Sequence, residues 1–305
     1  MGSIRVIAPG PFSTLQDLGR RGRGHQGVAR AGAFDLHSHR LANRLVGNRE
    51  EAATIEILFG PCEYEAMRDV VLALTGTDVM ITIRGTKLIT EGAGGFRQQV
   101  STRDEVCSRA FVVRSGERVA VGVPAHGLRT YLAVRGGFDM PPVLGSRSYD
   151  SLGQIGPPPL RAEDTLSIGS VVAADPWFEP IPLRPASDLI SVPLMLGPRH
   201  DWLSNASLAA LGLLTWTVDP ASNRTGIRFA GPRLERRVGE LASEAMIPGA
   251  VQLPPSGLPI VLGPDGGTTG GYPVIGVIGQ SGMDALAQRR PGEEIRFHVL
   301  SVERL

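Results

Sequence analysis

Lysine is almost missing from this chain of 305 residues: Lys87 is the only one, and arginine supplies the other basic side chains except histidine. Covalent attachment of biotin normally needs a lysine flanked by methionines. Lys87 stands instead in Arg84-Gly85-Thr86-Lys87-Leu88. We therefore expect no covalently bound cofactor.

Cysteine is scarce as well. Cys62 and Cys107 are isolated and form no C-x-x-C pair, which argues against a zinc site and against a disulfide framework. The six histidines show no metal-binding spacing, and His37 and His39 point to different faces of a predicted helix. We predict no metal site.

Several motifs of known chemistry are also lacking. The chain has no G-x-x-x-x-G-K-[ST] and no G-x-G-x-x-G between a strand and a helix, so it carries no nucleotide fingerprint. It has neither a G-x-S-x-G elbow nor an H-E-x-x-H helix. These absences leave hydrolases with a nucleophile elbow and zinc proteases unsupported.

Charge blocks and long apolar runs are missing too. The formal net charge is +1, and the densest basic cluster, residues 20–23, is too short for a nucleic-acid stripe. No apolar run reaches 18 residues, and the first residues lack the basic region and apolar core of a signal peptide. We expect a cytoplasmic protein that binds neither nucleic acid nor membrane.

Glycine and proline, in contrast, are abundant: 39 Gly and 24 Pro are spread along the chain. This spread, without regular strand–helix alternation, predicts a mainly β fold with barrel-like curvature and a few short helices. Helices are expected at 35–46, 204–211 and 283–288, and a glycine-rich loop at 12–22. Strands are expected at 4–8, 53–59, 70–75, 79–83, 106–113, 118–123, 130–135, 165–168, 192–196, 214–218, 227–230, 250–253, 259–262, 274–278 and 294–300.

A proline-rich stretch at 175–185 is the best linker candidate, because proline fixes extended chain and interrupts helices and central strands. It predicts two β-rich lobes, residues 1–183 and residues 184–305.

The stretch Asp265–Pro273 is the first candidate for chemistry. Four glycines surround two threonine hydroxyls, with a carboxylate before them and Tyr272 after them. Glycine allows positive φ and close approach of a ligand to backbone N–H groups. The stretch predicts either a loop that holds an anionic or carbonyl-bearing substrate or a wide hairpin turn between the strands at 259–262 and 274–278.

Three further loops collect polar groups. Gln16 and Asp17 with Arg20 offer an amide, a carboxylate and a cation within one turn, and the 219–226 loop carries Asn223 and Arg224. Arginine suits bidentate recognition of a carboxylate. The 254–257 turn presents Ser256. Each loop is equally explained as a turn closed by side-chain hydrogen bonds.

Glu56 interrupts an apolar strand in Thr54-Ile55-Glu56-Ile57. A carboxylate there must face solvent, pair with an arginine or line a pocket. We expect an outward-facing position.

Taken together, these loops resemble the KipA family, also called allophanate hydrolase subunit 2 or the biotin-dependent carboxyltransferase subunit family. The family includes the C subunit of bacterial ATP-hydrolysing 5-oxoprolinase. The matching motifs run in order along nearly the whole chain: Gln16–Arg20, Ala31–Asp35, Leu41–Asn48, Arg135–Asp139, Pro141–Ser148, Gly197–Pro198 with Asp201–Trp202, Ser222–Gly226, Pro248–Gln252, Pro254–Gly257 and Thr268–Pro273.

The resemblance implies a cyclophilin-like β-barrel protein that shares a site with a KipI-like B subunit. In 5-oxoprolinase a LamB/YcsF-like A subunit is also needed, and the complex uses ATP to open 5-oxoproline to glutamate. In urea carboxylase the similar region belongs to a carboxyltransferase that receives a carboxyl group from biotin held on a separate carrier. A third possibility is regulation, in which the chain only binds a KipI-like kinase inhibitor.

The sequence departs from the family pattern at three places, one of which is the 149–154 segment, with fewer glycines than the family pattern leads us to expect. Gly267 replaces a glutamine that often precedes the Thr-Thr-Gly-Gly-Tyr-Pro run, and Ala31-Gly32-Ala33-Phe34-Asp35 replaces Ser-Gly-Ala-Met-Asp. These changes bear on the identity of the substrate more than on the fold.

We predict a protein that handles a small amide or lactam together with partners, with Arg20 or Arg224 pairing with a substrate carboxylate and Asp17 orienting one of these cations. Backbone amides of residues 268–271 would stabilise developing negative charge. The predicted catalytic residues are Asp17, Asp265, Thr268 and Thr269. The predicted substrate-binding residues are Gln16, Arg20, Asn223, Arg224, Ser256, Gly270, Gly271 and Tyr272.

Overall fold

A computed structural model describes residues 2–91, 95–182 and 189–300. The fold is mainly β, as predicted, with three α-helices among these residues: α1 (Leu36–Leu45), α2 (Asn205–Leu213) and α3 (Gln280–Ala287). The described strands lie either before residue 169 or after residue 188. We call residues 2–182 the N-terminal lobe and residues 189–300 the barrel lobe. The predicted boundary between residues 183 and 184 falls outside the described residues.

The N-terminal lobe consists of two sheets packed face to face. One sheet has the strand order β11-β1-β4-β9-β6-β7 and the other β2-β3-β10-β5-β8. Apolar residues of both sheets share one core cluster, which includes Val6, Ile55, Ile81 and Leu132. The strand bounds are β1 (Gly2–Ala8), β2 (Phe12–Gln16), β3 (Thr54–Leu58), β4 (Cys62–Ala66), β5 (Val70–Thr75), β6 (Ile81–Glu91), β7 (Gly95–Glu105), β8 (Ala110–Val113), β9 (Arg118–Val121), β10 (Arg129–Val134) and β11 (Thr165–Ile168).

The barrel lobe is a closed barrel in the order β12-β19-β16-β17-β14-β13-β20, and it confirms the predicted barrel. The parallel pairing of β12 with β20 closes it. Trp216, Phe229 and Phe297 fill its interior. The strand bounds are β12 (Leu189–Leu196), β13 (Thr215–Val218), β14 (Gly226–Ala230), β16 (Ala250–Gln252), β17 (Ile260–Leu262), β19 (Val274–Ile278) and β20 (Glu294–Leu300), with β15 (Glu244–Ala245) and β18 (Thr269–Gly270) paired outside it.

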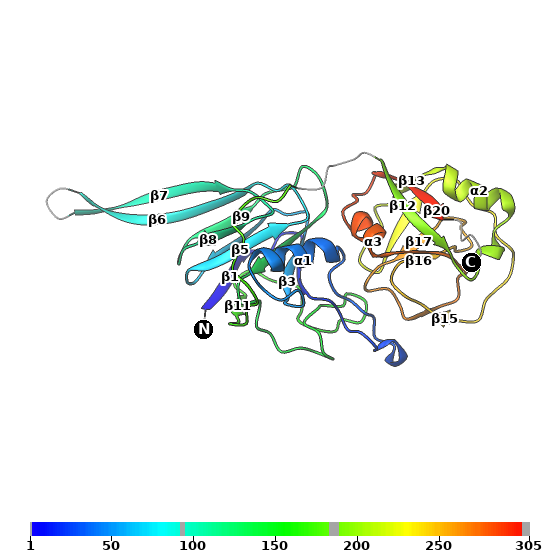
Figure 1. Cartoon of the computed structure of the whole chain (residues 1–305), viewed down its shortest axis with the longest axis horizontal. Coiled ribbons are helices and arrows are strands. Elements are labelled where there is room, and N and C mark those ends of the chain that lie inside the picture. Colours follow the sequence, from blue (N-terminus) through cyan, green and yellow to red (C-terminus); the bar gives the residue numbers. More distant parts are fainter. Residues whose placement is uncertain (1, 92–94, 183–188, 301–305) are drawn as a thin grey trace.

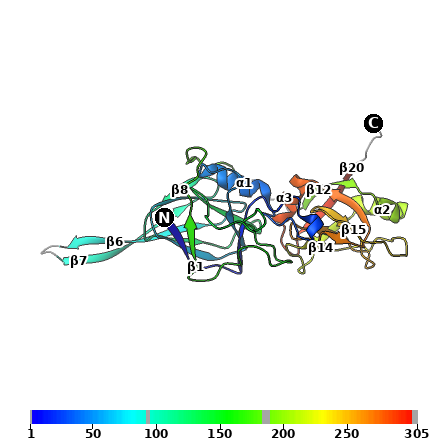
Figure 2. The same cartoon turned by 90° about the horizontal axis from the view of Figure 1, so that it is seen from below.

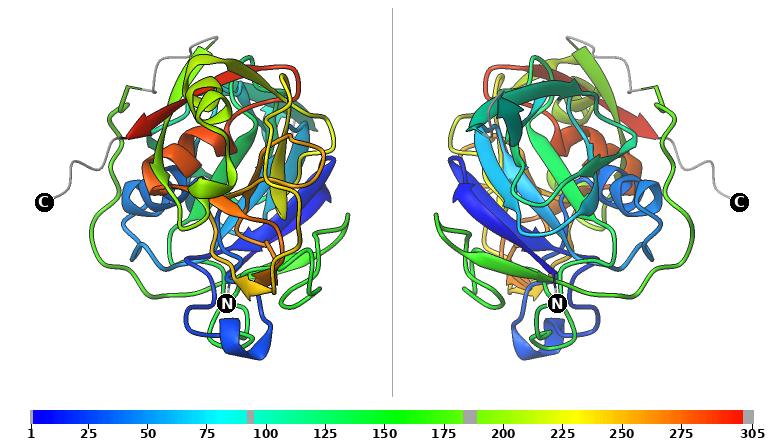
Figure 3. Two further views of the ribbon diagram at one scale, coloured as in Figure 1. Left: turned by 90° about the vertical axis from the view of Figure 1, so that its right-hand side faces the viewer. Right: turned by 90° about the vertical axis from the view of Figure 1, so that its left-hand side faces the viewer.

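The two lobes lie side by side along the long axis of the molecule, and the β6–β7 hairpin extends from the opposite end of the N-terminal lobe (Figures 1 and 2). The left-hand view of Figure 3 looks at the molecule from the barrel end. Each helix in the described ranges is too short or too polar to cross a lipid bilayer.

Helix α1 forms where the capping chemistry of the sequence predicts it. The Asp35 carboxylate accepts hydrogen bonds from the Ser38 amide at 2.9 Å and the Ser38 hydroxyl at 2.6 Å. Leu36, Ala42 and Leu45 are buried on the helix face that packs against the five-stranded sheet. This helix covers β10, which is therefore buried on both faces.

One local prediction was wrong. Residues 12–22 were expected to be a single loop, but Phe12–Gln16 is strand β2, paired with β3. Its polar residues hide the strand pattern, because they are buried and satisfied by hydrogen bonds that sequence alone does not reveal. The Ser13 hydroxyl donates to Pro9 O, and the Gln16 amide donates to Thr14 Oγ1 and Tyr149 O. Strand β4 was likewise not predicted.

The lobes meet along a seam that includes the end of α3. The Gln288 side chain accepts hydrogen bonds from the Leu128 and Arg129 amides at 2.9 Å. Its Nε2 donates to the Asp35 carboxylate at 2.8 Å. One side chain of the barrel lobe thus binds both β10 and the N-terminal cap of α1.

Buried His39 on α1 generates a pH prediction. Burial lowers its pKa from 6.5 to about 4, and its ring nitrogens contact Thr54 Oγ1 and Glu50 O, each at 2.9 Å. In the unfolded chain His39 takes up a proton near pH 6.5, whereas in the folded chain it becomes protonated only near pH 4. Stability is therefore lost as pH falls through this window, and we expect a loss from His39 of about 2 kcal/mol between pH 7 and pH 5.

Urea unfolding at both pH values measures this loss. His39→Gln should remove it from the pH dependence, while His37→Gln, a change at an exposed position of the same helix, should keep it. Equal pH dependence in wild type and His39→Gln would rule out His39 as its source.

Candidate active site between the two lobes

Arg224 is the centre of the seam. It lies in the turn between β13 and β14, and its guanidinium binds Asp265 through two hydrogen bonds of 2.8 Å each. The same side chain crosses to the N-terminal lobe, where it donates to Glu56 Oε1 at 2.5 Å and to Gly32 O at 2.7 Å. One guanidinium therefore connects both lobes.

Glu56 on β3 does not face outward as predicted, because only 4% of it is exposed. Its Oε2 accepts hydrogen bonds from Tyr131 Oη at 2.8 Å and from the Phe34 amide at 2.9 Å. Arg129 Nε lies 3.7 Å from Glu56 Oε1, and Arg129 Cζ lies over the Phe34 ring, 4.5 Å from its centre. The carboxylate that interrupts the apolar strand pattern at Glu56 is thus one half of a buried ion pair.

The charges in this cluster compensate one another. Burial raises the pKa of Glu56, but Arg224 and Arg129 outweigh that effect, so the pKa lies below its ordinary value. Burial lowers the pKa of Arg224, but Asp265 and Glu56 outweigh it and hold the pKa above its ordinary value. Both residues therefore stay charged at neutral pH.

Asp265, the first residue of the glycine-rich stretch, is completely buried. Besides Arg224, its carboxylate accepts hydrogen bonds from the Ser151 amide at 2.9 Å and the Ser151 hydroxyl at 2.7 Å. Ser151 belongs to the long loop of the N-terminal lobe, so Asp265 also holds a contact between the lobes.

Asp17 and Arg20 organise that same loop from the other side. The Asp17 carboxylate accepts hydrogen bonds from the Ser146 and Ser148 hydroxyls, each at 2.6 Å. The buried Arg20 guanidinium donates to three backbone carbonyls, those of Val143, Ser148 and Ile155. Within the described ranges, hydroxyls and backbone amides rather than a guanidinium donate to the Asp17 carboxylate.

The glycine-rich stretch 265–273 is not a hairpin turn. Strands β17 and β19 do not pair with each other, because β16 lies between them and pairs with both. None of its glycines adopts a left-handed backbone conformation. At Gly266 a Cβ would lie 3.1 Å from Gly263 O, so close packing explains why glycine is needed at this position. Thr269, Gly271 and Tyr272 are exposed.

Asn223 and Ser256 close turns with their side chains. Asn223 Oδ1 accepts hydrogen bonds from the Thr225 amide at 2.8 Å and the Gly226 amide at 3.3 Å. Ser256 Oγ accepts from the Leu258 amide at 3.4 Å. The turn explanation considered for these loops accounts for both side chains.

The predicted residues thus separate into two groups. Gln16, Asp17 and Arg20 gather at the 143–156 loop, which Ser151 joins to Asp265 and Arg224. Within the described part of the chain, no side-chain hydrogen bond or ion pair joins the exposed residues of 268–272, or Ser256, to that cluster. The structure adds four residues to that cluster: Glu56, which was expected to face outward, and Arg129, Tyr131 and Ser151, which sequence reasoning missed.

Two cavities lie along the seam. The larger has a volume of about 880 Å³, within the size range of ligand sites. Its apolar lining includes Phe12, Phe59, Leu128 and Leu286. Its polar lining includes Glu56, Arg129, Ser151, Asn223, Arg224 and Thr225.

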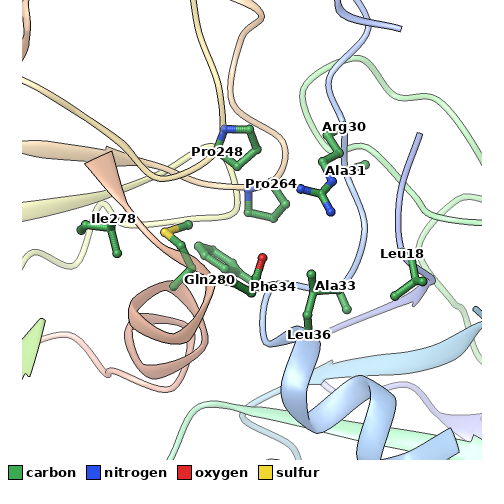
Figure 4. A pocket seen from close by; sticks show the side chains of 11 residues that line it. Leu18, Arg30, Ala31, Ala33, Phe34, Leu36, Pro248, Pro264, Ile278 and Gln280 are labelled. Carbon is green, nitrogen blue, oxygen red and sulfur yellow. The ribbon is translucent and has the colours of Figure 1, made fainter. Parts of the chain in front are cut away.

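The smaller pocket, of about 80 Å³, lies beside the 30–36 segment. Figure 4 shows Arg30 reaching toward Pro264, with Gln280 and Leu36 below them in this view. Ala31 and Phe34, at two of the positions that depart from the family pattern, also line it. No group of three or more metal-binding side chains is found in the part of the chain that the structure describes.

The fold and its motifs match a known family. A family model named carboxyltransferase domain, subdomain A and B, matches residues 26–299. The chain belongs to this family. This match confirms the resemblance seen in the sequence motifs.

Two relatives correspond to this chain over most of their own length. It is 34% identical to the 5-oxoprolinase C subunit of Escherichia coli K12, covering 98% of this chain and 92% of that protein. It is 31% identical to the Haemophilus influenzae protein of the same name, covering 95% and 89%. Urea amidolyase of Lachancea kluyveri is 28% identical, and the match covers 99% of this chain but only 17% of that protein.

Solved structures agree with the fold. The crystal structure of TTHA0988 superposes with a TM-score of 0.83 at 34% identity, and the match covers 99% of this chain and 56% of that one. The Kluyveromyces lactis urea amidolyase gives a TM-score of 0.84 at 26% identity, covering 98% and 19%. The chain therefore spans about half of TTHA0988 and a fifth of the urea amidolyase.

The buried ion network generates a stability prediction. Glu56→Gln keeps the shape of the side chain but leaves Arg224 and Arg129 with less compensation, and we expect a loss of about 3–5 kcal/mol in the free energy of unfolding. The matched control is Glu65→Gln, because Glu65 pairs at 2.7 Å with Arg5, which is about a third exposed. Urea denaturation of both variants checks this difference.

The control should lose much less, because water screens its ion pair. If the two variants were equally stable, the seam network would not be a main source of stability.

Proposed function

We propose that this chain is the C subunit of an ATP-dependent complex of the 5-oxoprolinase type, which opens a small lactam, 5-oxoproline, to glutamate. Its partners are a KipI-like B subunit and a LamB/YcsF-like A subunit, and the complex works in the cytoplasm. ATP is a substrate of the complex. This chain supplies part of a shared site rather than a complete one.

The extent of the match carries this proposal. The two 5-oxoprolinase C subunits are 34% and 31% identical to this chain and match it over 92% and 89% of their length. The urea amidolyases contain the same region as about a sixth of a much longer protein. The region that this chain represents therefore corresponds to nearly a whole 5-oxoprolinase C subunit, which supports the proposal.

The seam is the part of the chain that we assign to this shared site. Here Arg224 and Glu56 face the large cavity, and Asp265 holds Arg224 in place. We propose that Asp265 and Asp17 act as positioning residues, since their carboxylates are already occupied by protein donors. In the 268–272 run, the exposed Thr269 and Tyr272 remain available for substrate or for the B subunit.

A second candidate is a carboxyltransferase that acts on urea or a related amide. The family name and the similarity to the urea amidolyases favour it. In that case a separate carrier protein would supply carboxybiotin, and the biotin ring would bind in the apolar part of the large cavity.

The test is reconstitution with the neighbouring A and B subunits and measurement of ATP-dependent glutamate release from 5-oxoproline. We expect Asp265→Asn to lower turnover at least tenfold, because small displacements of positioned groups are costly to catalysis. Asp201→Asn, which removes an exposed carboxylate paired with Arg237 at 3.2 Å, should leave turnover within about twofold of wild type.

Thr268→Ala tests the exposed run separately. Turnover unchanged in both Asp265→Asn and Thr268→Ala would reject the assigned site. Carboxylation of an amide with a biotin carboxyl donor would favour the carboxyltransferase. A stable complex with the KipI-like protein and no turnover of either kind would favour a purely regulatory role.

A further inference from the structure

A ligand that carries a carboxylate needs a cation that the protein has not already neutralised. Of the two arginines first predicted for this role, Arg224 is neutralised by two carboxylates. Arg20 keeps an unpartnered Nη1 among the described residues, but it is buried against three backbone carbonyls and lines neither seam cavity. Freeing either one would break the seam or the 143–156 loop. A third arginine is a better candidate.

Arg30 is that third arginine. It is half-buried, and its side chain makes no hydrogen bond or ion pair with any residue in the described ranges. Burial lowers its pKa, and the nearby Arg21 and Arg40 lower it further. No carboxylate of the described residues offsets these effects, so the local field favours an added anion.

The backbone holds Arg30 firmly at the seam. Its carbonyl accepts a hydrogen bond from the Arg20 amide at 2.6 Å, and the next amide, that of Ala31, donates to Pro264 O at 2.8 Å. Gly32 O accepts from Arg224. Ala31 adopts a φ of 52°, a conformation that is rare outside glycine and that concentrates at functional sites.

The pocket in front of Arg30 has the size and lining for a small ring. Its 80 Å³ is several times the roughly 10–15 Å³ that one water molecule needs. Leu18, Phe34, Ile278 and Met283 supply apolar walls, and Gln280 supplies an amide. Apolar walls with a few polar groups are typical of sites for small molecules.

We propose that Arg30 binds the carboxylate of a small cyclic acid in this pocket, while the apolar walls receive the ring. Identifying that acid as 5-oxoproline rests on the proposed function; the carboxylate site itself does not. A phosphate group would compete for the same guanidinium, so inorganic phosphate is included as a competitor in the second experiment.

The first experiment measures KM for 5-oxoproline in the complex reconstituted from all three subunits. Arg30→Gln should raise KM about 10- to 100-fold, the effect of losing a hydrogen bond to a charged group. Arg30→Lys, which keeps the charge but loses the planar fork, should give a smaller rise. Arg233→Gln is the matched control, since it removes the same charge from an exposed position that does not line the pocket.

The second experiment needs no turnover. Binding of cyclopentanecarboxylate and of its neutral amide to the full chain is measured by protein-observed NMR, with inorganic phosphate as a competitor. Wild type and Arg233→Gln should prefer the acid to the amide, and Arg30→Gln should lose this preference. Circular dichroism and urea unfolding verify that the variants are folded.

The two experiments separate the site from the function. Acid binding that depends on Arg30, without turnover of 5-oxoproline, supports the carboxylate site and rejects the 5-oxoprolinase assignment. Turnover with an unchanged KM in Arg30→Gln rejects the site and leaves the function. The site is also rejected if wild type does not bind the acid, if Arg233→Gln loses binding equally, or if phosphate displaces the acid at lower concentration than the amide does.

Discussion

The structure depends on one buried cation that must be neutralised from both lobes. Arg224 is 5% exposed, and it is compensated by Asp265 of its own lobe and Glu56 of the other. With Arg129 beside Glu56, the formal charges of the four side chains sum to zero. Separating the lobes would leave charged groups unpaired, which is more costly than breaking an ordinary surface contact. The network therefore sets the relative position of the sheets and the barrel.

That constraint extends to segments that carry no charge themselves. Gly32 O is held by Arg224, the Phe34 amide by Glu56 and the Ser151 amide by Asp265. Two loops of the N-terminal lobe are thus fixed against the barrel at their backbones. The two cavities lie beside these fixed segments. A ligand entering either cavity meets walls that are already ordered, which limits the entropy cost of binding.

The residues that follow the family motifs and those that depart from them lie in different parts of the site. Arg224 of the seam network and residues 143–148 lie in motifs that the sequence shares with the family to which the chain belongs. Ala31 and Phe34, which depart from those motifs, line the small pocket. A common frame can therefore hold different small substrates, because a change in the pocket wall leaves the buried ion pairs intact.

The sequence by itself determined the β-rich class, the cap and bounds of α1, and the loops in which polar groups gather, because these depend on local patterns of glycine, proline and capping residues. It also carried the family motifs. Only the tertiary structure decided which polar groups are free. Glu56 looked exposed and is buried, and Arg20 looked available and is occupied, because their partners lie far away in sequence. The stretch 265–273 predicted either a substrate-binding loop or a hairpin turn, and the structure rules out the hairpin, because β16, from an earlier part of the chain, lies between its flanking strands.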